Sequence, residues 1–165
     1  MEQFKKALEL NNSYCEAHIG IGSIYTDKGM IDAAINEYKK AIMHAPDCFN
    51  ANIKLGVLYA TQAGQKDMAV AEFKRAININ PSSFEAHNNL GVAYDELGQS
   101  DKAVAEYQYA LKLSPDNADT HYNLGLVYKK MALTDKAIEE FKRTLEINPN
   151  YYNARIQLEN FSSVR

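Results

Sequence analysis

Three histidines recur at the same position of a repeated sequence pattern, and histidine is a common metal ligand. They are His18, His87 and His121. Each ligand of one zinc ion must lie about 2 Å from it, whereas helices packed side by side are about 8–10 Å apart. Only two of these histidines fall in adjacent units, and no cysteine or carboxylate cluster joins them. The sequence therefore predicts packing histidines, with no metal site and no cofactor.

The two cysteines, Cys15 and Cys48, lie near the start of successive units. The same spacing between helices separates them, so a native disulfide is not expected. Two cysteines are also no disulfide framework, and a reduced, cytoplasmic setting is the expectation that follows. The chain has no phosphate-binding glycine loop, nucleophile elbow or helical metal motif. The prediction is that the protein is not an enzyme.

Composition excludes two classes of partner. The 165 residues carry a net charge of -3 with 24% charged side chains, which fits a soluble globular protein. Because nothing is strongly basic, nucleic acid is not an expected partner. No apolar run is long enough to cross a bilayer, and the N-terminal residues lack the apolar core of a signal peptide. Direct membrane insertion is therefore not expected.

The clearest feature of the chain is a unit of about 34 residues that occurs four times. Each unit contains a glycine followed three residues later by a tyrosine, and then an alanine followed four residues later by an aromatic residue. A helix-breaking proline closes the unit. The glycines are Gly22, Gly56, Gly91 and Gly125, the later aromatics are Tyr38, Phe73, Tyr107 and Phe141, and the prolines are Pro46, Pro81, Pro115 and Pro149.

Each unit predicts two amphipathic helices, as residues 84–117 illustrate. A stripe at i, i+3, i+4 and i+7 predicts the first helix; its members are His87, Leu90, Gly91 and Tyr94. The second stripe consists of Ala103, Tyr107, Ala110 and Leu111. A hairpin this small cannot bury both stripes by itself. We therefore expect the units to stack, with the glycines allowing close approach of helices beside the aromatics.

This pattern resembles the tetratricopeptide repeat family, and the resemblance covers nearly the whole chain. It implies an all-α, right-handed superhelical solenoid of antiparallel helix pairs, with about ten helices. The family's large aromatic residue early in the first helix is replaced here by His18, Asn52, His87 and His121.

The predicted boundaries follow the repeat. Residues 1–14 resemble the second helix of an incomplete repeat, and the four repeats span 15–48, 49–83, 84–117 and 118–151, of which 49–83 has a one-residue insertion. Residues 152–165 are expected to form a capping helix with a polar outer face. The leading helix lacks cap character, which suggests a fragment of a longer array or a partner that docks on that end.

In the family, first helices line a concave face that holds extended peptides or helices. The resemblance therefore implies a groove for a segment of a partner protein. The stripe opposite the packed stripe mixes apolar and amide side chains, which suits such a groove. Apolar pockets are expected at Ile53, Val57, Val92, Tyr122 and Leu126, although the four aliphatic residues could instead pack between neighbouring first helices.

Amides and charges would orient the ligand. Asn88, Asn89 and Asn123 are the candidate amides, and a carboxamide matches both the N–H and the C=O of a peptide unit. Asn89 and Asn123 occupy the same position in successive repeats. This arrangement is similar to the asparagine rows in the superhelical arm of O-linked N-acetylglucosamine transferases. In the second repeat, Lys54 takes this position. The alternative is that asparagine is simply common at this position.

Charged residues of the groove add polarity. A ligand with a basic residue over Asp95 and an acidic one over Lys129 and Lys130 would be complementary. Ordinary solvated charges are the alternative.

The predicted function is a non-catalytic protein–protein interaction scaffold that binds a peptide or helix in the concave groove. One alternative is homo-oligomerisation through the uncapped N-terminal helix, with Phe4, Ala7 and Leu8 on its docking face. The other is an arm of a larger enzyme such as a glycosyltransferase.

Overall fold

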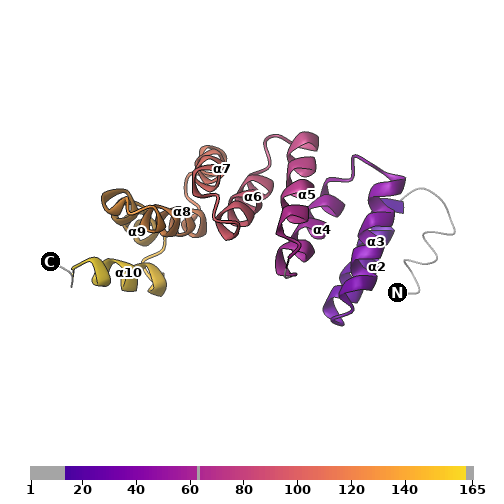
Figure 1. The fold of residues 1–165 in the computed structure, drawn as a ribbon, viewed down its shortest axis with the longest axis horizontal. Helices are drawn as coiled ribbons and strands as arrows, with labels where there is room; N and C mark the ends of the chain where they lie inside the picture. Colours follow the sequence, from indigo (N-terminus) through magenta and orange to yellow (C-terminus); the bar gives the residue numbers. More distant parts are fainter. Residues whose placement is uncertain (1–13, 63, 163–165) are drawn as a thin grey trace. The chain divides into compact units, whose positions relative to one another are not determined.

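The computed structural model describes residues 14–62 and 64–162, which form nine helices and no strand (Figure 1). The helix predicted within residues 1–14 lies outside these residues. The described helices are α2 (Tyr14–Asp27), α3 (Ile31–His44), α4 (Phe49–Thr61), α5 (Lys66–Ile79), α6 (Phe84–Glu96), α7 (Ser100–Leu113), α8 (Ala118–Lys130), α9 (Thr134–Ile147) and α10 (Tyr152–Ser162). None of these helices is long and apolar enough to cross a membrane.

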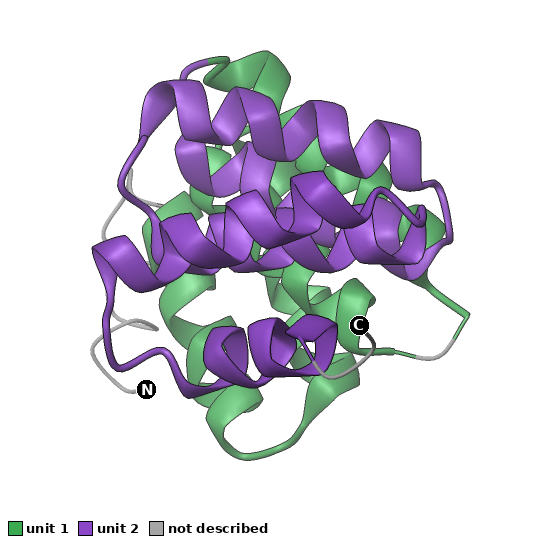
Figure 2. Cartoon of the chain, turned by 90° about the vertical axis from the view of Figure 1, so that its left-hand side faces the viewer, with its two compact units in different colours: residues 1–81 green, residues 82–165 purple. Residues whose placement is uncertain are grey.

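The chain divides into two compact units, residues 1–81 and residues 82–165 (Figure 2). In the first unit, α2 pairs with α3 and α4 pairs with α5, and α3 also packs against α4. In the second unit, α6 pairs with α7 and α8 pairs with α9, while α7 packs against α8 and α9 against α10. Three second helices therefore each lie between two first helices. They are α3 between α2 and α4, α7 between α6 and α8, and α9 between α8 and α10.

The glycine of each first helix faces the aromatic ring of its second helix. A Cβ built on Gly22, Gly56, Gly91 or Gly125 would lie only 2.6 to 2.8 Å from the nearest carbon of that ring. The rings are those of Tyr38, Phe73, Tyr107 and Phe141, and each is at most 2% exposed. The buried ring cannot move aside, so the close approach of the two helices requires glycine at this position.

Polar caps begin two of the first helices. The side chain of Ser83 accepts a hydrogen bond from the backbone N–H of Ala86 at 3.2 Å, and the side chain of Asn117 accepts one from Thr120 at 2.9 Å. These caps satisfy N–H groups that have no partner inside the helix. Each second helix also has an aspartate in its first turn, where a negative charge is favourable; they are Asp32, Asp67, Asp101 and Asp135.

The cysteines depart from expectation, because Cys15 and Cys48 form a disulfide with their Cα atoms 6.3 Å apart. The expectation of no disulfide used the spacing between whole helix axes. Cys15 lies in the first turn of α2 and Cys48 is the N-cap of α4, where the two chains come closer. There Cys48 packs with Ala41 and Ala51, and Cys15 lies against this cluster. A Cα separation of this size is within the range that a disulfide spans.

Candidate functional site

The recurrent histidines connect the two helices of one repeat. His18 Nδ1 lies 2.7 Å from Glu37 Oε2, His87 Nδ1 lies 2.7 Å from Glu106 Oε2, and His121 Nδ1 lies 2.6 Å from Glu140 Oε2. The described residues contain no group of three His, Cys, Asp or Glu side chains that could hold a metal ion. Each pair joins the two helices of its repeat, and the constant spacing of 19 residues between histidine and glutamate is the sequence signal of this contact.

Two of these groups have shifted pKa values. Burial lowers the pKa of the His121 imidazole, but the hydrogen bonds to Glu140 and to the Pro115 carbonyl, with the charge of Glu140, outweigh burial and leave the pKa raised. For Glu37, burial raises the pKa, and the hydrogen bonds and charges of Lys40 and His18 bring it below its ordinary value. Both shifts favour the charged form of the group.

In the first unit, a cavity of about 150 Å³ opens between α2 and α4. It is lined by Ser23, Thr26, Asp27, Tyr38, Lys54, Val57 and Leu58. The Tyr38 hydroxyl reaches it from α3 and lies 3.2 Å from Ser23 Oγ and 3.4 Å from Thr26 Oγ1. The structure therefore brings the predicted groove residues Lys54 and Val57 to one polar hollow, in which Val57 is 41% exposed.

Ile53 has a different position from its expected one. Its side chain is only 4% exposed, so it packs inside the first unit and is not offered to a ligand. The sequence pattern alone left both possibilities open for the aliphatic residues. Val92 and Leu126 in the second unit are half-buried.

The predicted amides of the second unit fall into two kinds. The Asn88 carbonyl oxygen accepts a hydrogen bond from Thr120 Oγ1 at 2.9 Å, which connects α6 to α8. Asn89 and Asn123 are half-buried, and among the described residues their side chains have no hydrogen-bond partner. Their carboxamides therefore keep both donors and an acceptor available.

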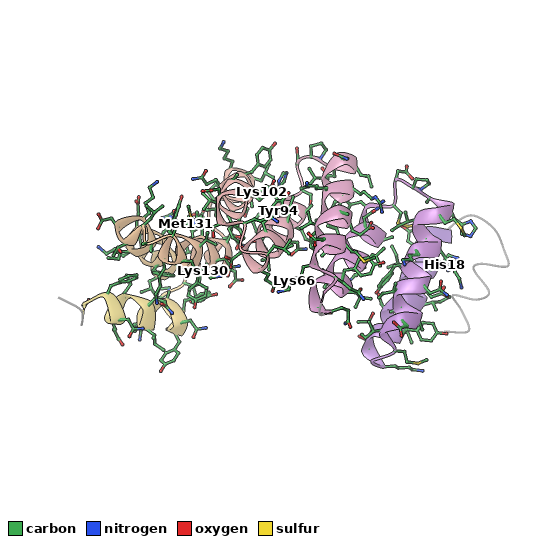
Figure 3. The ribbon with its side chains drawn as sticks, in the orientation of Figure 1. His18, Lys66, Tyr94, Lys102, Lys130 and Met131 are labelled. Carbon is green, nitrogen blue, oxygen red and sulfur yellow. A yellow bond between two sulfur atoms is a disulfide. The ribbon has the colours of Figure 1, made fainter. Side chains whose placement is uncertain are left out.

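The predicted charges of the second unit are already paired. Lys130 Nζ donates to Asp95 Oδ2 at 2.6 Å, and Lys129 Nζ donates to Gln157 Oε1 at 2.7 Å. The Lys129 ammonium also lies 5.7 Å from the centre of the Phe161 ring. Figure 3 labels Lys130 at the end of α8. A ligand that used these charges would have to replace contacts between first helices, so the structure does not favour the expected charge pattern.

Tyr122 belongs to an aromatic cluster. Its ring lies 5.0 Å from that of Tyr151 and 5.6 Å from that of Phe141, between centroids. The Tyr151 hydroxyl donates to Asp119 at 2.9 Å, and burial, followed by this hydrogen bond, raises the pKa of Tyr151. With the Asn88 and Lys130 links, these contacts fix α8 to α6 and to the residue that precedes α10, and Asn89 and Asn123 have no side-chain partner among the described residues.

Helix hairpins packed in this way, with a glycine against an aromatic ring in each, define the class of α-helical repeat proteins. A family model described as "TPR repeat" matches residues 22–63, 60–98 and 96–131, and one described as "Tetratricopeptide repeat" matches residues 118–151. The chain belongs to the tetratricopeptide repeat family, and the expected all-α superhelical solenoid of antiparallel helix pairs is confirmed. No curated protein sequence matches the chain.

Solved structures agree with this assignment. A crystal structure of MamA is 32% identical, covers 88% of this chain and 79% of its own, and superposes with a TM-score of 0.82. YrrB, described as "a TPR protein with an unusual peptide-binding site", is 26% identical over 94% of this chain and 80% of its own, with a TM-score of 0.81. TTC0263, a thermophilic TPR protein of Thermus thermophilus, shares the fold at 24% identity, 95% and 86% coverage and a TM-score of 0.74. The similarity to TPR proteins of this kind indicates a role in protein–protein interaction.

Proposed function

We propose that the protein is a non-catalytic scaffold that binds an extended segment of a partner protein along its first helices. The observation that carries the proposal is the pair of amides on Asn89 and Asn123, which share one phase and have no hydrogen-bond partner among the described residues. A carboxamide can bond to both groups of a peptide unit, and two of them on successive first helices would hold an extended backbone.

The surroundings of the two amides support this kind of ligand. Val92 and Leu126 lie one turn away on the same helices and are half-buried, so they add apolar contact beside each amide. The links Asn88–Thr120 and Lys130–Asp95 preorganise α6 and α8, which reduces the entropy lost on binding. The peptide-binding site in the description of YrrB is that protein's own, and it makes a peptide the first ligand class to test here.

The test uses a random peptide library on phage, with the 165-residue chain as bait, followed by calorimetric titration of a selected peptide. Replacing Asn89 and Asn123 by alanine should weaken binding by about 0.5–1.5 kcal/mol for each lost hydrogen bond. Asn160→Ala, an exposed asparagine of α10, is the matched control and should bind like the unchanged chain. Equal affinity of the double variant and the control would refute the amide role, and a library without any binder would refute peptide recognition.

Self-assembly is the second candidate function, and it concerns another surface. The observation that favours it is a pair of half-buried apolar side chains on α10, Leu158 and Phe161, in the second unit.

A further inference from the structure

The polar hollow between α2 and α4 is lined by one acidic and one basic side chain. Asp27 is the last residue of α2 and Lys54 lies within α4, and both side chains are exposed. Neither of them makes an ion pair with a described residue. The inner wall is closed, since Tyr38 is 1% exposed and Leu58 is 5% exposed. At about 150 Å³ the hollow is well below the roughly 300–1,000 Å³ of sites for whole small molecules, so it suits a single side chain.

Three hydroxyl groups line the hollow, and their protons can all be used within α2 and α3. Thr26 Oγ1 donates to the Gly22 carbonyl at 3.0 Å. The Tyr38 hydroxyl lies 3.4 Å from Thr26 Oγ1, which can then only accept, and 3.2 Å from Ser23 Oγ. All of these contacts are satisfied when Ser23 donates to Tyr38 and Tyr38 donates to Thr26. The hydroxyl oxygens then offer lone pairs to the hollow, and a group that donates hydrogen bonds is the one that fits.

The second unit shows which donor suits this place in the repeat. There Asp95 and Lys130 occupy the positions of Thr26 and Thr61. Lys130 Nζ donates to Asp95 Oδ2 at 2.6 Å, so an ammonium group bridges the first helices α6 and α8. The chain itself therefore places a lysine between two neighbouring first helices, against a carboxylate at the end of the earlier one.

In the first unit no described ammonium group bridges α2 and α4 in this way. Thr61 Oγ1 donates to the Leu58 carbonyl of its own helix at 2.8 Å, so it does not reach α2. Thr26 has no carboxylate, but Asp27 follows it directly and supplies one. The first unit thus retains the acceptors for an ammonium group and leaves the place of the ammonium group open.

Lys54 is the basic residue of the hollow, and it lies on the helix opposite the acceptors. Ser23, Thr26 and Asp27 belong to α2, whereas Lys54 belongs to α4 and is exposed. Its long aliphatic stem allows the charged end to remain in water. It still repels a cation bound in the hollow, because like charges repel at short range. Replacing Lys54 by a neutral residue should therefore strengthen the binding of a cation and weaken the binding of an anion.

The disulfide holds α2 and α4 together beyond the hollow. Cys15 lies in the first turn of α2 and Cys48 directly precedes α4. The hollow lies further along both helices, at Ser23 and Asp27 of α2 and at Val57 of α4. A covalent link at one end restricts the distance between the helices at the other, so the site is preorganised and loses less entropy on binding.

We propose that the hollow binds the side-chain ammonium group of a lysine in the partner segment. The ammonium group donates to the Asp27 carboxylate and to the hydroxyl oxygens of Ser23 and Tyr38, since it carries three donors. The aliphatic stem of the lysine lies against Val57, which is 41% exposed. This inference rests on the proposed function in that the occupant belongs to a peptide, and it adds a required residue type to that peptide.

A nuclear magnetic resonance titration of the isotope-labelled 165-residue chain tests the proposal. The probe is the capped tripeptide acetyl-Ala-Lys-Ala-amide, and its matched probe contains norleucine, which keeps the stem but lacks the ammonium group. The lysine probe should shift the amide signals of residues 23–27 and 54–58 saturably and bind about threefold to tenfold more tightly than the norleucine probe. Equal affinity of the two probes, or no saturable shift with the lysine probe, would overturn the proposal.

Two single variants establish the charge of the occupant. Asp27→Asn should weaken the lysine probe by about threefold or more, because it removes the carboxylate. The matched control is Glu16→Gln, which removes another exposed carboxylate of α2 and should bind like the unchanged chain. Lys54→Asn introduces the residue that Asn89 and Asn123 provide at this position, and it should tighten binding by about twofold to threefold. If Asp27→Asn binds as tightly as the control, or if Lys54→Asn weakens binding, the hollow does not take a cation and the proposal is wrong.

A double variant closes the hollow with the chain's own lysine. Thr26→Asp with Thr61→Lys copies the pair Asp95 and Lys130 into the first unit. The introduced ammonium group should occupy the hollow and reduce the affinity for the lysine probe by about threefold or more. Unchanged affinity would mean that the probe binds elsewhere, which contradicts the proposed site.

Two further comparisons identify the source of the ammonium group and separate this proposal from the one on the amides. Butylamine carries the same group without peptide units, and tighter binding of butylamine than of the lysine probe would contradict a peptide occupant. The double variant of Asn89 and Asn123 should bind the lysine probe like the unchanged chain, because those amides belong to the second unit. A chain that binds the library-selected peptide but not the lysine probe would refute this proposal alone, whereas a library without any binder would refute the proposed function.

Discussion

At the scale of single residues, the contact between a glycine and an aromatic ring sets how closely the two helices of a repeat approach. Gly125 lies against Phe141, which is completely buried, and a Cβ at residue 125 would be 2.7 Å from the nearest ring carbon. The exposed turn glycine Gly98 has a different role, because its φ of 71° is the reason for glycine there and nothing lies near its Cβ position.

We predict that Gly125→Ala lowers the free energy of unfolding by about 1–3 kcal/mol, the usual cost of overpacking a rigid core. The cause is steric, so the cost of Gly125→Ala should be smaller in a chain that already carries Phe141→Leu. Urea denaturation of the four chains of this double-mutant cycle measures the coupling. Additive effects of the two substitutions would show that the ring does not set the helix spacing.

The pair of His121 and Glu140 adds a dependence on pH. The pKa of His121 is raised in the folded chain by Glu140 and the Pro115 carbonyl, against the effects of burial and of Arg143. A raised folded pKa means that the stabilisation is fully present below pH 6.5, the ordinary value, and is lost as the pH rises through the folded pKa.

We therefore predict that His121→Asn destabilises the chain more at about pH 5.5 than at about pH 8, the range in which an imidazole loses its proton. Asparagine is a suitable replacement because Asn52 already occupies this position in the second repeat. Urea denaturation at several pH values measures the difference, and Glu140→Gln should reduce the same pH dependence. A stability difference that does not change with pH would contradict the assignment.

At the scale of helices, the disulfide is a constraint that is independent of the repeat packing. It joins α2 to the start of α4 across a separation of 33 residues. We predict that the double variant Cys15→Ser, Cys48→Ser loses about 3–4 kcal/mol of unfolding free energy, the loop-closure value for a loop of this length. Denaturation with and without reductant measures it, because the reduced unchanged chain should match the variant. If reductant leaves the unchanged chain as stable as before, the disulfide does not contribute to folding.

The helices themselves were predictable because each is determined by local sequence. The recurring positions of the glycines, aromatic residues and prolines placed the hairpins. Contacts between neighbouring repeats were not predictable in this way. Cys15 and Cys48, or Lys130 and Asp95, are 33 and 35 residues apart, and whether their side chains meet depends on the lateral separation of two helices. A pattern that repeats every 34 residues shows which residues occupy equivalent positions, but it does not give the lateral distance between neighbouring helices.

The candidate groove shows the same limit. The sequence placed Asn88, Asn89 and Asn123 on one stripe, and their equal chemistry made them equal candidates. The structure separates them, since Asn88 bonds to Thr120 and the other two have no partner among the described residues. Thr120 is fully buried in the next repeat, where nothing in its own pattern indicates a polar link.

At the scale of the whole chain, stability should be distributed repeat by repeat. Within each unit the repeats contact their nearest neighbours, and arrays of repeats behave approximately as a sum of repeat stabilities and interface terms. A local perturbation should therefore have its largest effect in its own repeat and a smaller one in more distant repeats.

We predict that hydrogen exchange will show this locality for two changes made at opposite ends of the described chain. Reduction of Cys15–Cys48 should accelerate exchange most in α2, α3 and α4, whereas Gly125→Ala should accelerate it most in α8 and α9, because exchange follows local opening. Exchange measured by mass spectrometry on the 165-residue chain resolves the two regions, and Tyr152→Ser serves as a surface control. Equal acceleration of exchange in all helices by either change would instead mean that the chain opens as one cooperative unit. In that case a ligand bound to Asn89 and Asn123 would also slow exchange in α2.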